Sequence, residues 1–369
     1  MKTEDRAIPW FGPEVGEREK ALLAEAIDTN YINDGPMTRR FEAEIAKLAG
    51  TKYAVGVTSG TTAISLALMG LGIGHGDEVI VPDLTFAATA NAVTMTGATV
   101  RLADIEPARF AIDPAGLRGA LSPRTRAIVT VDVNGRGADY AAIEAFAKAH
   151  GLAVVCDAAE GLGSHRGGRP LGSFGHAGCF SFSANKTVST GQGGMITTND
   201  AKLHDRLREL KDQGRRHQGT GGDDSHPVLG YNFKLTSLQA AVGLAQLERL
   251  PARLAFARER DRWYREGLAG CPGIVLPEVD HAGGEVVQWT DALVERKDAL
   301  RRALEAARVG HRAFWFPVHA HEPYAAPAAQ FPVATRISAQ GLWLPSAYSL
   351  TQADVARACD AIRAALKGR

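Results

Sequence analysis

The chain has 369 residues, of which 45% are hydrophobic and 22% are charged. These values are typical of a globular protein and exclude a disordered or low-complexity chain. The 42 Lys and Arg residues almost balance the 41 Asp and Glu residues, which leaves a formal net charge of +1. This balance gives no electrostatic basis for binding nucleic acid or an anionic membrane surface.

Cysteine spacing and the N-terminal segment indicate the compartment. The four cysteines form no CxxC pair, so their spacing indicates neither a disulfide framework nor a zinc site. Residues 1–6 are mostly polar and lack the apolar segment of a signal peptide, and no apolar run reaches the roughly 18 residues of a membrane helix. We therefore expect a cytoplasmic protein without a metal site.

Short apolar runs alternate with helical patterns in the first part of the chain. The predicted strands are residues 53–57, 78–82, 127–133 and 152–156. The helical patterns lie at residues 63–69, 87–96 and 140–150. This alternation predicts βαβ units and a largely parallel sheet. Two further runs, 178–182 and 194–198, are closely spaced and predict an antiparallel or local addition to that sheet.

The pattern changes after Pro251. The predicted elements there are a long Arg-rich helix at 252–268, a strand at 288–294, and helices at 296–308 and 354–367, the last behind the capping residue Thr351. We predict a large α/β domain over residues 1–250, with an N-terminal arm over about residues 1–30, and a smaller α+β domain over 251–369. The Gly- and Asp-containing segment 213–224 predicts a mobile loop.

Ligands of parallel α/β sheets bind beyond the carboxyl ends of the strands, and two polar groups lie there. Ser59-Gly60-Thr61 follows a strand and opens a helix, where free N–H groups hold a phosphate. The same residues are also compatible with an ordinary N-cap. Asp157 ends a hydrophobic run, so its carboxylate needs a hydrogen bond or a cation. It is either an N-cap or the partner of a cationic ligand group.

Lys186 lies between two strand-like runs, just before a Gly-rich turn at 191–194. In a desolvated site its amine loses a proton readily and can attack a carbonyl, whereas at a sheet edge it would extend to solvent. A phosphate cradle, a strand-end carboxylate and such a lysine match one cofactor. Pyridoxal phosphate needs a lysine for its aldehyde, an acid for its ring nitrogen and a helix terminus for its phosphate. We predict pyridoxal phosphate bound covalently to Lys186.

Five ordered segments resemble the DegT/DnrJ/EryC1/StrS family of sugar aminotransferases. They are SGTTAISLAL (59–68), GDEVIVPDLTF (76–86), DAAEGLGS (157–164), FSFSANKTVSTGQGGMI (180–196) and GYNFKLTSLQAAVGLAQL (230–247). The resemblance implies the fold-type I architecture of pyridoxal phosphate enzymes, with a mostly parallel seven-stranded sheet flanked by helices and a smaller α+β C-terminal domain. It also implies transfer of an amino group, from L-glutamate, to a keto sugar that is usually nucleotide-linked, in amino-sugar or polysaccharide biosynthesis. The alternatives are a sugar dehydratase or epimerase on the same scaffold, or a non-catalytic regulator.

The resemblance also assigns roles to residues. Lys186 is expected to bind the cofactor and carry the proton, and Asp157 to bind the pyridine nitrogen. Phe86 is expected to stack on the cofactor ring, and Glu160 to lie near its phenolic oxygen. Gly60, Thr61 and Ser181 are expected to bind the phosphate. Asn232 is expected to reach the cofactor phosphate in the active site of the partner subunit. This last role implies a homodimer with shared active sites.

Four residues are expected at the substrate site: Asn33, Asp34, Asn134 and His319. The chain departs from the family in having Val131-Asp132-Val133-Asn134-Gly135 where VHLYG is usual, and GQGG in place of GEGG at 191–194. The first departure leaves open whether the keto sugar is nucleotide-linked. Some relatives with His at the lysine position remove oxygen from sugars, and Lys186 argues against that reaction here.

Overall fold

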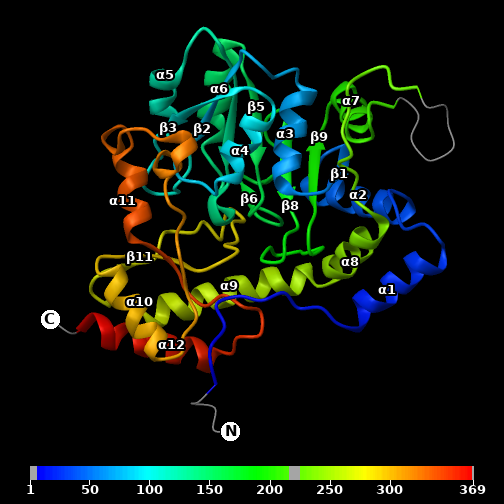
Figure 1. Cartoon of the computed structure of the whole chain (residues 1–369). Coiled ribbons are helices and arrows are strands. Elements are labelled where there is room, and N and C mark those ends of the chain that lie inside the picture. Colours follow the sequence, from blue (N-terminus) through cyan, green and yellow to red (C-terminus); the bar gives the residue numbers. More distant parts are fainter. Residues whose placement is uncertain (1–5, 216–224, 368–369) are drawn as a thin grey trace.

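The computed structural model describes residues 6–215 and 225–367. Its centre is a seven-stranded sheet with the order β1-β9-β8-β5-β4-β2-β3 (Figure 1). The strands are β1 (Tyr53–Val57), β2 (Glu78–Pro82), β3 (Thr99–Ala103), β4 (Thr125–Val131), β5 (Ala153–Asp157), β8 (Ala177–Ser181) and β9 (Gly194–Thr198). Neighbouring strands from β8 to β3 are parallel, and β9 is antiparallel to both β1 and β8. The predicted mostly parallel sheet and the antiparallel place of 194–198 are confirmed.

Helices cover both faces of this sheet, which explains why its strands are continuous apolar runs. Val79 and Val81 belong to one buried cluster with residues of α3 (Gly60–Gly70) and α7 (Ala201–Lys211), whereas Ile80 between them belongs to a second cluster with residues of α6 (Tyr140–His150) on the other face. The remaining helices of this part are α1 (Glu17–Asp28), α2 (Pro36–Ala49), α4 (Ala88–Met95), α5 (Leu117–Ala120) and α8 (Ser237–Glu248). The carboxyl ends of β4, β5 and β8 therefore emerge at one edge, where polar residues are concentrated.

A second, antiparallel sheet with the order β10-β11-β13-β12 lies later in the chain. Its strands are β10 (Ile274–Val275), β11 (Asp291–Val294), β12 (Arg312–Ala313) and β13 (Gly341–Trp343). Its helices are α9 (Leu250–Gly267), α10 (Lys297–Ala306), α11 (Pro332–Gln340) and α12 (Gln352–Lys367). Figure 1 shows α8 and α9 passing below the large sheet, with α10 and α12 beneath α9. The α+β character of this part agrees with expectation, while the division into domains near residue 250 stays a prediction.

Short elements complete the fold. They are the hairpin strands β6 (His165–Arg166) and β7 (Arg169–Pro170), and the 3-10 turns at Pro114–Gly116, Val133–Gly135, Val318–Ala320, Glu322–Tyr324 and Ala328–Gln330. Thr351 caps α12 as predicted, since its Oγ1 accepts the N–H of Asp354 at 3.2 Å. Within the described part of the chain, no helix has the length and apolar character to span a bilayer.

Several predicted boundaries are wrong. The strand predicted at 127–133 ends at Val131, because Asn134 adopts φ 56° in the turn that follows. The strand predicted at 288–294 begins only at Asp291. The sequence does not reveal β3, whose first four side chains alternate between exposed and half-buried at the sheet edge. Of the predicted mobile loop, residues 216–224 lie outside the described residues.

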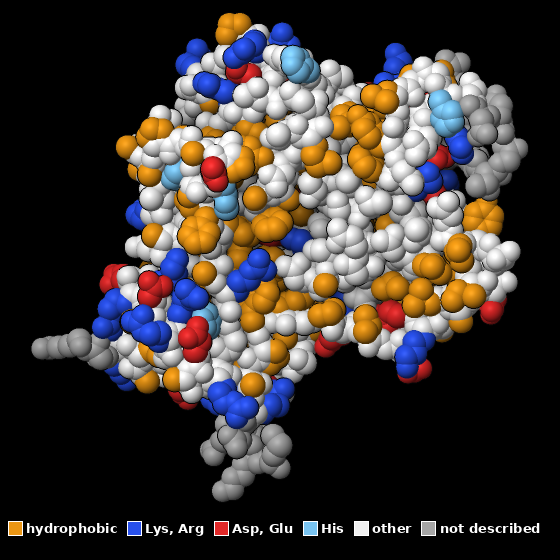
Figure 2. Space-filling model, viewed as in Figure 1, with side chains coloured by type: hydrophobic (Ala, Val, Ile, Leu, Met, Phe, Trp, Pro, Cys, Tyr) orange, Lys and Arg blue, Asp and Glu red, His pale blue; other side chains and the backbone are white. Residues whose placement is uncertain are grey.

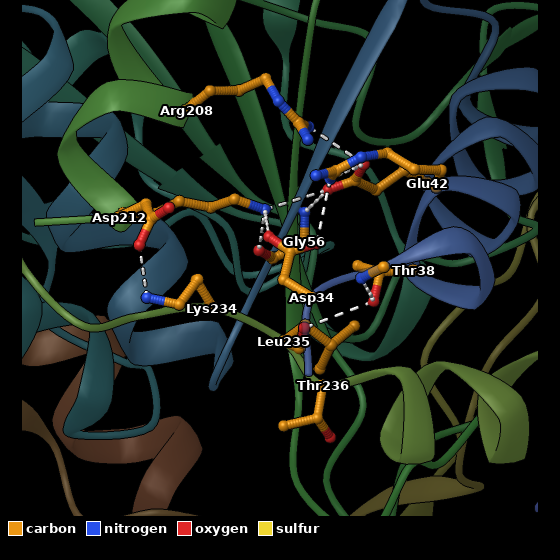
Figure 3. A network of polar contacts seen from close by, with 12 residues as sticks. Asp34, Thr38, Glu42, Gly56, Arg208, Asp212, Lys234, Leu235 and Thr236 are labelled. Carbon is orange, nitrogen blue, oxygen red and sulfur yellow. Dashed lines mark hydrogen bonds and ion pairs between the residues drawn. The ribbon is translucent and has the colours of Figure 1, made fainter. Parts of the chain in front are cut away.

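A buried ionic cluster joins α2, α7 and the segment before α2 (Figure 3). Lys211 Nζ, which is wholly buried, lies 3.0 Å from Asp34 Oδ2 and 3.2 Å from Glu42 Oε1, and it donates to Gly56 O at 3.1 Å. Arg208 Nη1 lies 3.0 Å from Glu42 Oε2. Although burial acts to raise the pKa of Glu42, Lys211, Arg208 and Arg39 lower it to about 2. The cluster therefore holds Glu42 in its charged form.

This cluster predicts a loss of stability in acid. Because the pKa of Glu42 is about 2 in the folded chain and 4.5 for an unperturbed glutamate, its contribution is complete above pH 4.5 and is lost as the pH falls toward 2. We expect Glu42→Gln to lower the free energy of unfolding by about 3 kcal/mol at pH 7 and by less at pH 3, measured in urea. Glu248→Gln, which breaks only the exposed pair with Arg18, is the control and should cost under about 1 kcal/mol. A difference that does not shrink at pH 3 contradicts this assignment.

Candidate active site

A cavity of about 280 Å³ lies where the carboxyl ends of β4 and β5 meet the first turn of α3. Seven of the expected cofactor residues line it: Gly60, Thr61, Phe86, Asp157, Glu160, Ser181 and Lys186. The second sheet and the segments beside it add Trp289, Arg312 and Trp315. Residues from three separate parts of the chain therefore meet at one cavity.

The first turn of α3 provides a cradle for an anion. Ser59 Oγ accepts the N–H of Thr62 at 3.1 Å, so Ser59 is the N-cap. In the described chain this cap leaves the N–H groups of Gly60 and Thr61 without an acceptor inside the helix. A Cβ on Gly60 would lie 2.8 Å from that of Ser181, so glycine is needed for this close approach. The cap and the anion cradle are thus combined in one turn.

Asp157 lies at the carboxyl end of β5 and is 7% exposed. Thr89 Oγ1 donates to its Oδ2 at 2.8 Å, and the N–H of Ala159 donates to its Oδ1 at 3.1 Å. Burial raises the pKa of Asp157, while these two donors and the nearby Lys186 act to lower it. Both oxygens accept hydrogen bonds, which oppose the effect of burial, and the carboxyl group faces the cavity, where a cationic group of a ligand could pair with it.

Lys186 lies between β8 and β9 with its side chain 12% exposed. Its Nζ donates to Glu160 Oε1 at 3.2 Å and lies 5.2 Å from the centre of the Trp289 ring. Arg253 fixes the adjoining backbone, since its Nη1 donates to Thr187 O at 2.7 Å. The lysine is therefore held in the cavity and not at a solvated sheet edge.

Asn134, expected at the substrate site, does not line the cavity and is completely buried. Its Nδ2 donates to Trp289 O at 2.6 Å, and its Oδ1 accepts the N–H of Trp289 at 2.7 Å. Its own N–H donates to Glu160 Oε2 at 2.8 Å. Asn134 therefore positions two cavity residues, and sequence reasoning missed Trp289 because its partner is 155 residues away.

Phe86 lines the cavity and is 55% exposed, as a ring that covers a bound group would be.

His319, expected at the substrate site, lies outside the lining of the cavity and is buried, with its Nδ1 2.6 Å from Asp83 Oδ2. Its N–H also donates to Asp83 Oδ1 at 2.8 Å. Asp83 begins the segment that carries Phe86, so the contacts of His319 with Asp83 hold this segment in position. A direct sugar contact by His319 stays a prediction.

The remaining expected residues lie apart from the cavity. Asp34 is bound by Lys211 and Arg39 in the buried ionic cluster, so its carboxylate is already engaged. Asn33 is exposed, and its carbonyl accepts the N–H of Ser237 at 2.8 Å. Asn232 is exposed and pairs with Asp212 in an isolated β-bridge. The substrate roles of Asn33 and Asp34 stay predictions that this geometry does not favour.

Asp132, one of the residues that depart from the family motif, is a cavity residue that the prediction missed. Tyr140 donates its hydroxyl to Asp132 Oδ1 at 2.6 Å, and within the described structure the buried Oδ2 has no partner. Burial, with a smaller contribution from the charge of Asp157, raises the pKa of Asp132 to about 7, although the hydrogen bonds from Tyr140 and Ala138 act to lower it. Arg109 also acts to lower this pKa. The carboxyl group therefore holds a proton in weak acid.

This proton predicts how stability depends on pH near neutrality. Between pH 3.8 and about 7 the folded chain holds a proton on Asp132 that the unfolded chain releases, so stability falls as the pH rises through this range. We expect the melting temperature of Asp132→Asn to fall less between pH 5 and pH 8 than that of the unchanged protein. Tyr140→Phe removes a hydrogen-bond donor that favours the ionised form of Asp132. The melting temperature of this variant should therefore fall more steeply over the same pH range than that of the unchanged protein. Identical pH profiles for all three proteins would contradict the assignment.

These residues fit pyridoxal phosphate. The N–H groups of Gly60 and Thr61 with Ser181 would hold the phosphate, Asp157 the ring nitrogen, and Lys186 the aldehyde carbon. Phe86 and Trp289 would enclose the ring. Among the described residues, no group of three or more His, Cys, Asp or Glu side chains is arranged to hold a metal ion.

Comparison with known proteins finds relatives over nearly the whole chain. Residues 13–363 match the DegT/DnrJ/EryC1/StrS aminotransferase family. GDP-perosamine synthase of Caulobacter vibrioides is 39% identical over 96% of this chain and 97% of that protein. UDP-N-acetyl-3-dehydro-alpha-D-glucosamine 3-aminotransferase of Acidithiobacillus ferrooxidans is 38% identical over 99% of this chain and 100% of that protein.

A solved structure gives the same result. DesV of S. venezuelae superimposes with a TM-score of 0.92 at 34% identity, over 98% of this chain and 99% of that chain. The resemblance of the five segments is thereby confirmed along the chain. The protein belongs to the DegT/DnrJ/EryC1/StrS aminotransferase family.

Proposed function

We propose that this protein is a pyridoxal phosphate-dependent aminotransferase that moves an amino group from L-glutamate to a keto group of a nucleotide-linked sugar. The observation that carries the proposal is the meeting of Lys186, Asp157 and the first turn of α3 at one cavity. Relatives over nearly the full length are named as a GDP-perosamine synthase and as an aminotransferase of a UDP-linked sugar, which supports the substrate class.

The cofactor, when bound, supplies an aldehyde that condenses with amines and a ring that withdraws electrons from the substrate carbon. Lys186 would bind it covalently and afterwards move a proton at Nζ between the substrate carbon and the cofactor carbon. Asp157 would hold the proton on the ring nitrogen, because its carboxylate is fixed by Thr89 and Ala159. Glu160, held by the N–H of Asn134, would keep the amine of Lys186 in place between these steps.

The active protein is proposed to be a homodimer in which Asn232 completes the partner's phosphate site. Asn232 is exposed and is not among the residues that line its own cavity. Leu229 near Asn232 in the sequence, and Tyr31 and Ile32 near Asn33, are exposed hydrophobic side chains.

Co-expression of Lys186→Ala and Asn232→Ala chains would test this assignment. The hybrid dimer contains one site with both residues intact and should be more active than either variant alone, whereas equal inactivity would count against sharing.

A single-turnover experiment tests the function. The cofactor-loaded protein is mixed with L-glutamate, and the loss of its visible colour is compared with the 2-oxoglutarate formed. We expect one equivalent of 2-oxoglutarate per site, followed by return of the colour when a keto sugar is added. Sugar conversion without 2-oxoglutarate would indicate a dehydratase or epimerase, and a protein that never takes up colour would indicate a non-catalytic role.

A further inference from the structure

Arg312 lines the cavity, and no acidic side chain in the described part of the chain pairs with it. It comes from β12 of the second sheet, where it pairs with Trp343 of β13, and its side chain reaches the cavity of Lys186 and Asp157. It is half-buried, and across residues 6–215 and 225–367 it has no hydrogen bond and no ion pair. A half-buried guanidinium without a carboxylate partner is uncommon, since its five donors need acceptors.

Each of the other charged groups of the cavity has at least one partner. Lys186 is paired with Glu160, Asp157 accepts from Thr89 and Ala159, and Asp132 accepts from Tyr140. Among the described cavity residues, Arg312 thus offers a positive charge that no neighbour neutralises. With the first turn of α3 occupied by the cofactor phosphate, a second anionic group entering the cavity would be attracted to this side chain.

Aromatic rings fix the guanidinium in place. Its carbon lies 5.2 Å from the centre of the Trp10 ring and 5.5 Å from that of Trp343. The ring centres of Trp343 and Trp289 are 5.0 Å apart, and Lys186 Nζ lies 5.2 Å from Trp289. Figure 2 shows hydrophobic side chains gathered near the middle of this face, with basic side chains beside them. Cation–π attraction to these indoles holds the guanidinium without using its N–H donors, which remain available to a ligand.

We propose that Arg312 is the binding residue for an anionic group of a substrate, either a carboxylate of the amino donor or a phosphate of the nucleotide-linked acceptor. Both groups accept two parallel hydrogen bonds from a guanidinium. Because Lys186 and Arg312 rest on the same set of indoles, an anion held by Arg312 would place the rest of the molecule toward the reactive lysine. This inference rests on the proposed function, but the binding that it predicts can be measured without turnover.

The test uses equilibrium titration of the cofactor-loaded protein with two kinds of unreactive probe. Glutarate, a dicarboxylate of the same length as L-glutamate, reports on the donor carboxylate, and the diphosphates UDP, GDP and dTDP report on the acceptor. We expect Arg312→Gln to weaken binding in one or both arms by about 10- to 100-fold, and Arg312→Lys by less, because lysine keeps the charge but loses the paired donors. The arm that weakens identifies the source of the anion.

Two controls keep the outcome clear. Arg262→Gln removes an exposed arginine that pairs with Glu259 and Glu266 on α9, and it should leave both arms unchanged. The melting temperature and the visible spectrum show whether each variant is folded and loaded. Unchanged binding of every probe by folded Arg312→Gln and Arg312→Lys would overturn the proposal. Weaker binding in these variants would support it even if the protein transferred no amino group, so the two failures are distinguishable.

Discussion

Replacement of Lys186 by alanine is expected to lower kcat by at least about 10³-fold and to abolish the visible colour of the lysine-bound cofactor. The reason is that this amine both binds the cofactor and moves the proton, and the described lining of the cavity holds no second lysine and no histidine that could replace it. Single-turnover absorbance with L-glutamate and steady-state rates measure the two losses separately.

Lys297→Ala is the matched control for this change. Lys297 is partly buried, donates to Ser338 O at 2.7 Å and does not line the cavity, so its loss should leave the colour and kcat unchanged. Small primary amines added to Lys186→Ala should restore part of the rate, because they enter the space of the missing side chain and accept the proton. Normal activity in Lys186→Ala would exclude the proposed function.

The second large effect is expected at Asp157. Replacement by asparagine removes the negative charge that would hold a proton on the ring nitrogen, and it turns one acceptor into a donor. The hydroxyl of Thr89 and the N–H of Ala159 both donate to the present carboxylate, so an amide cannot satisfy all of these contacts. We expect kcat to fall by about 10² to 10⁴-fold and the cofactor to dissociate more readily.

Thr89→Ser provides the comparison for Asp157→Asn. Serine keeps the hydroxyl that donates to Oδ2, so this variant should retain most of the rate. Dialysis followed by absorbance measures cofactor retention, and kcat is measured with saturating cofactor to separate binding from chemistry. An Asp157→Asn protein within threefold of the unchanged rate would show that the carboxylate has no role at the ring.

The sequence by itself was sufficient to predict most strands around the site and to place the proposed cofactor residues next to them. The runs 53–57, 78–82 and 194–198 match β1, β2 and β9 at both ends. These predictions were possible because buried strands, helix caps and glycine turns depend on residues that are neighbours in the sequence. Ligands of parallel sheets also bind at the strand ends, which the same local patterns locate. Gly60, Asp157 and Lys186 follow from such local signals.

Only the tertiary structure decided which distant side chains meet. Asn134 and Trp289 are 155 residues apart, and His319 and Asp83 are 236 residues apart. No spacing rule relates such pairs, so the sequence did not show that Asn134 supports Trp289 or that His319 supports the segment of Phe86. For the same reason Arg312 gave no signal. Its significance comes from the lack of a carboxylate partner among the described residues and from the indoles that lie against it near the lysine.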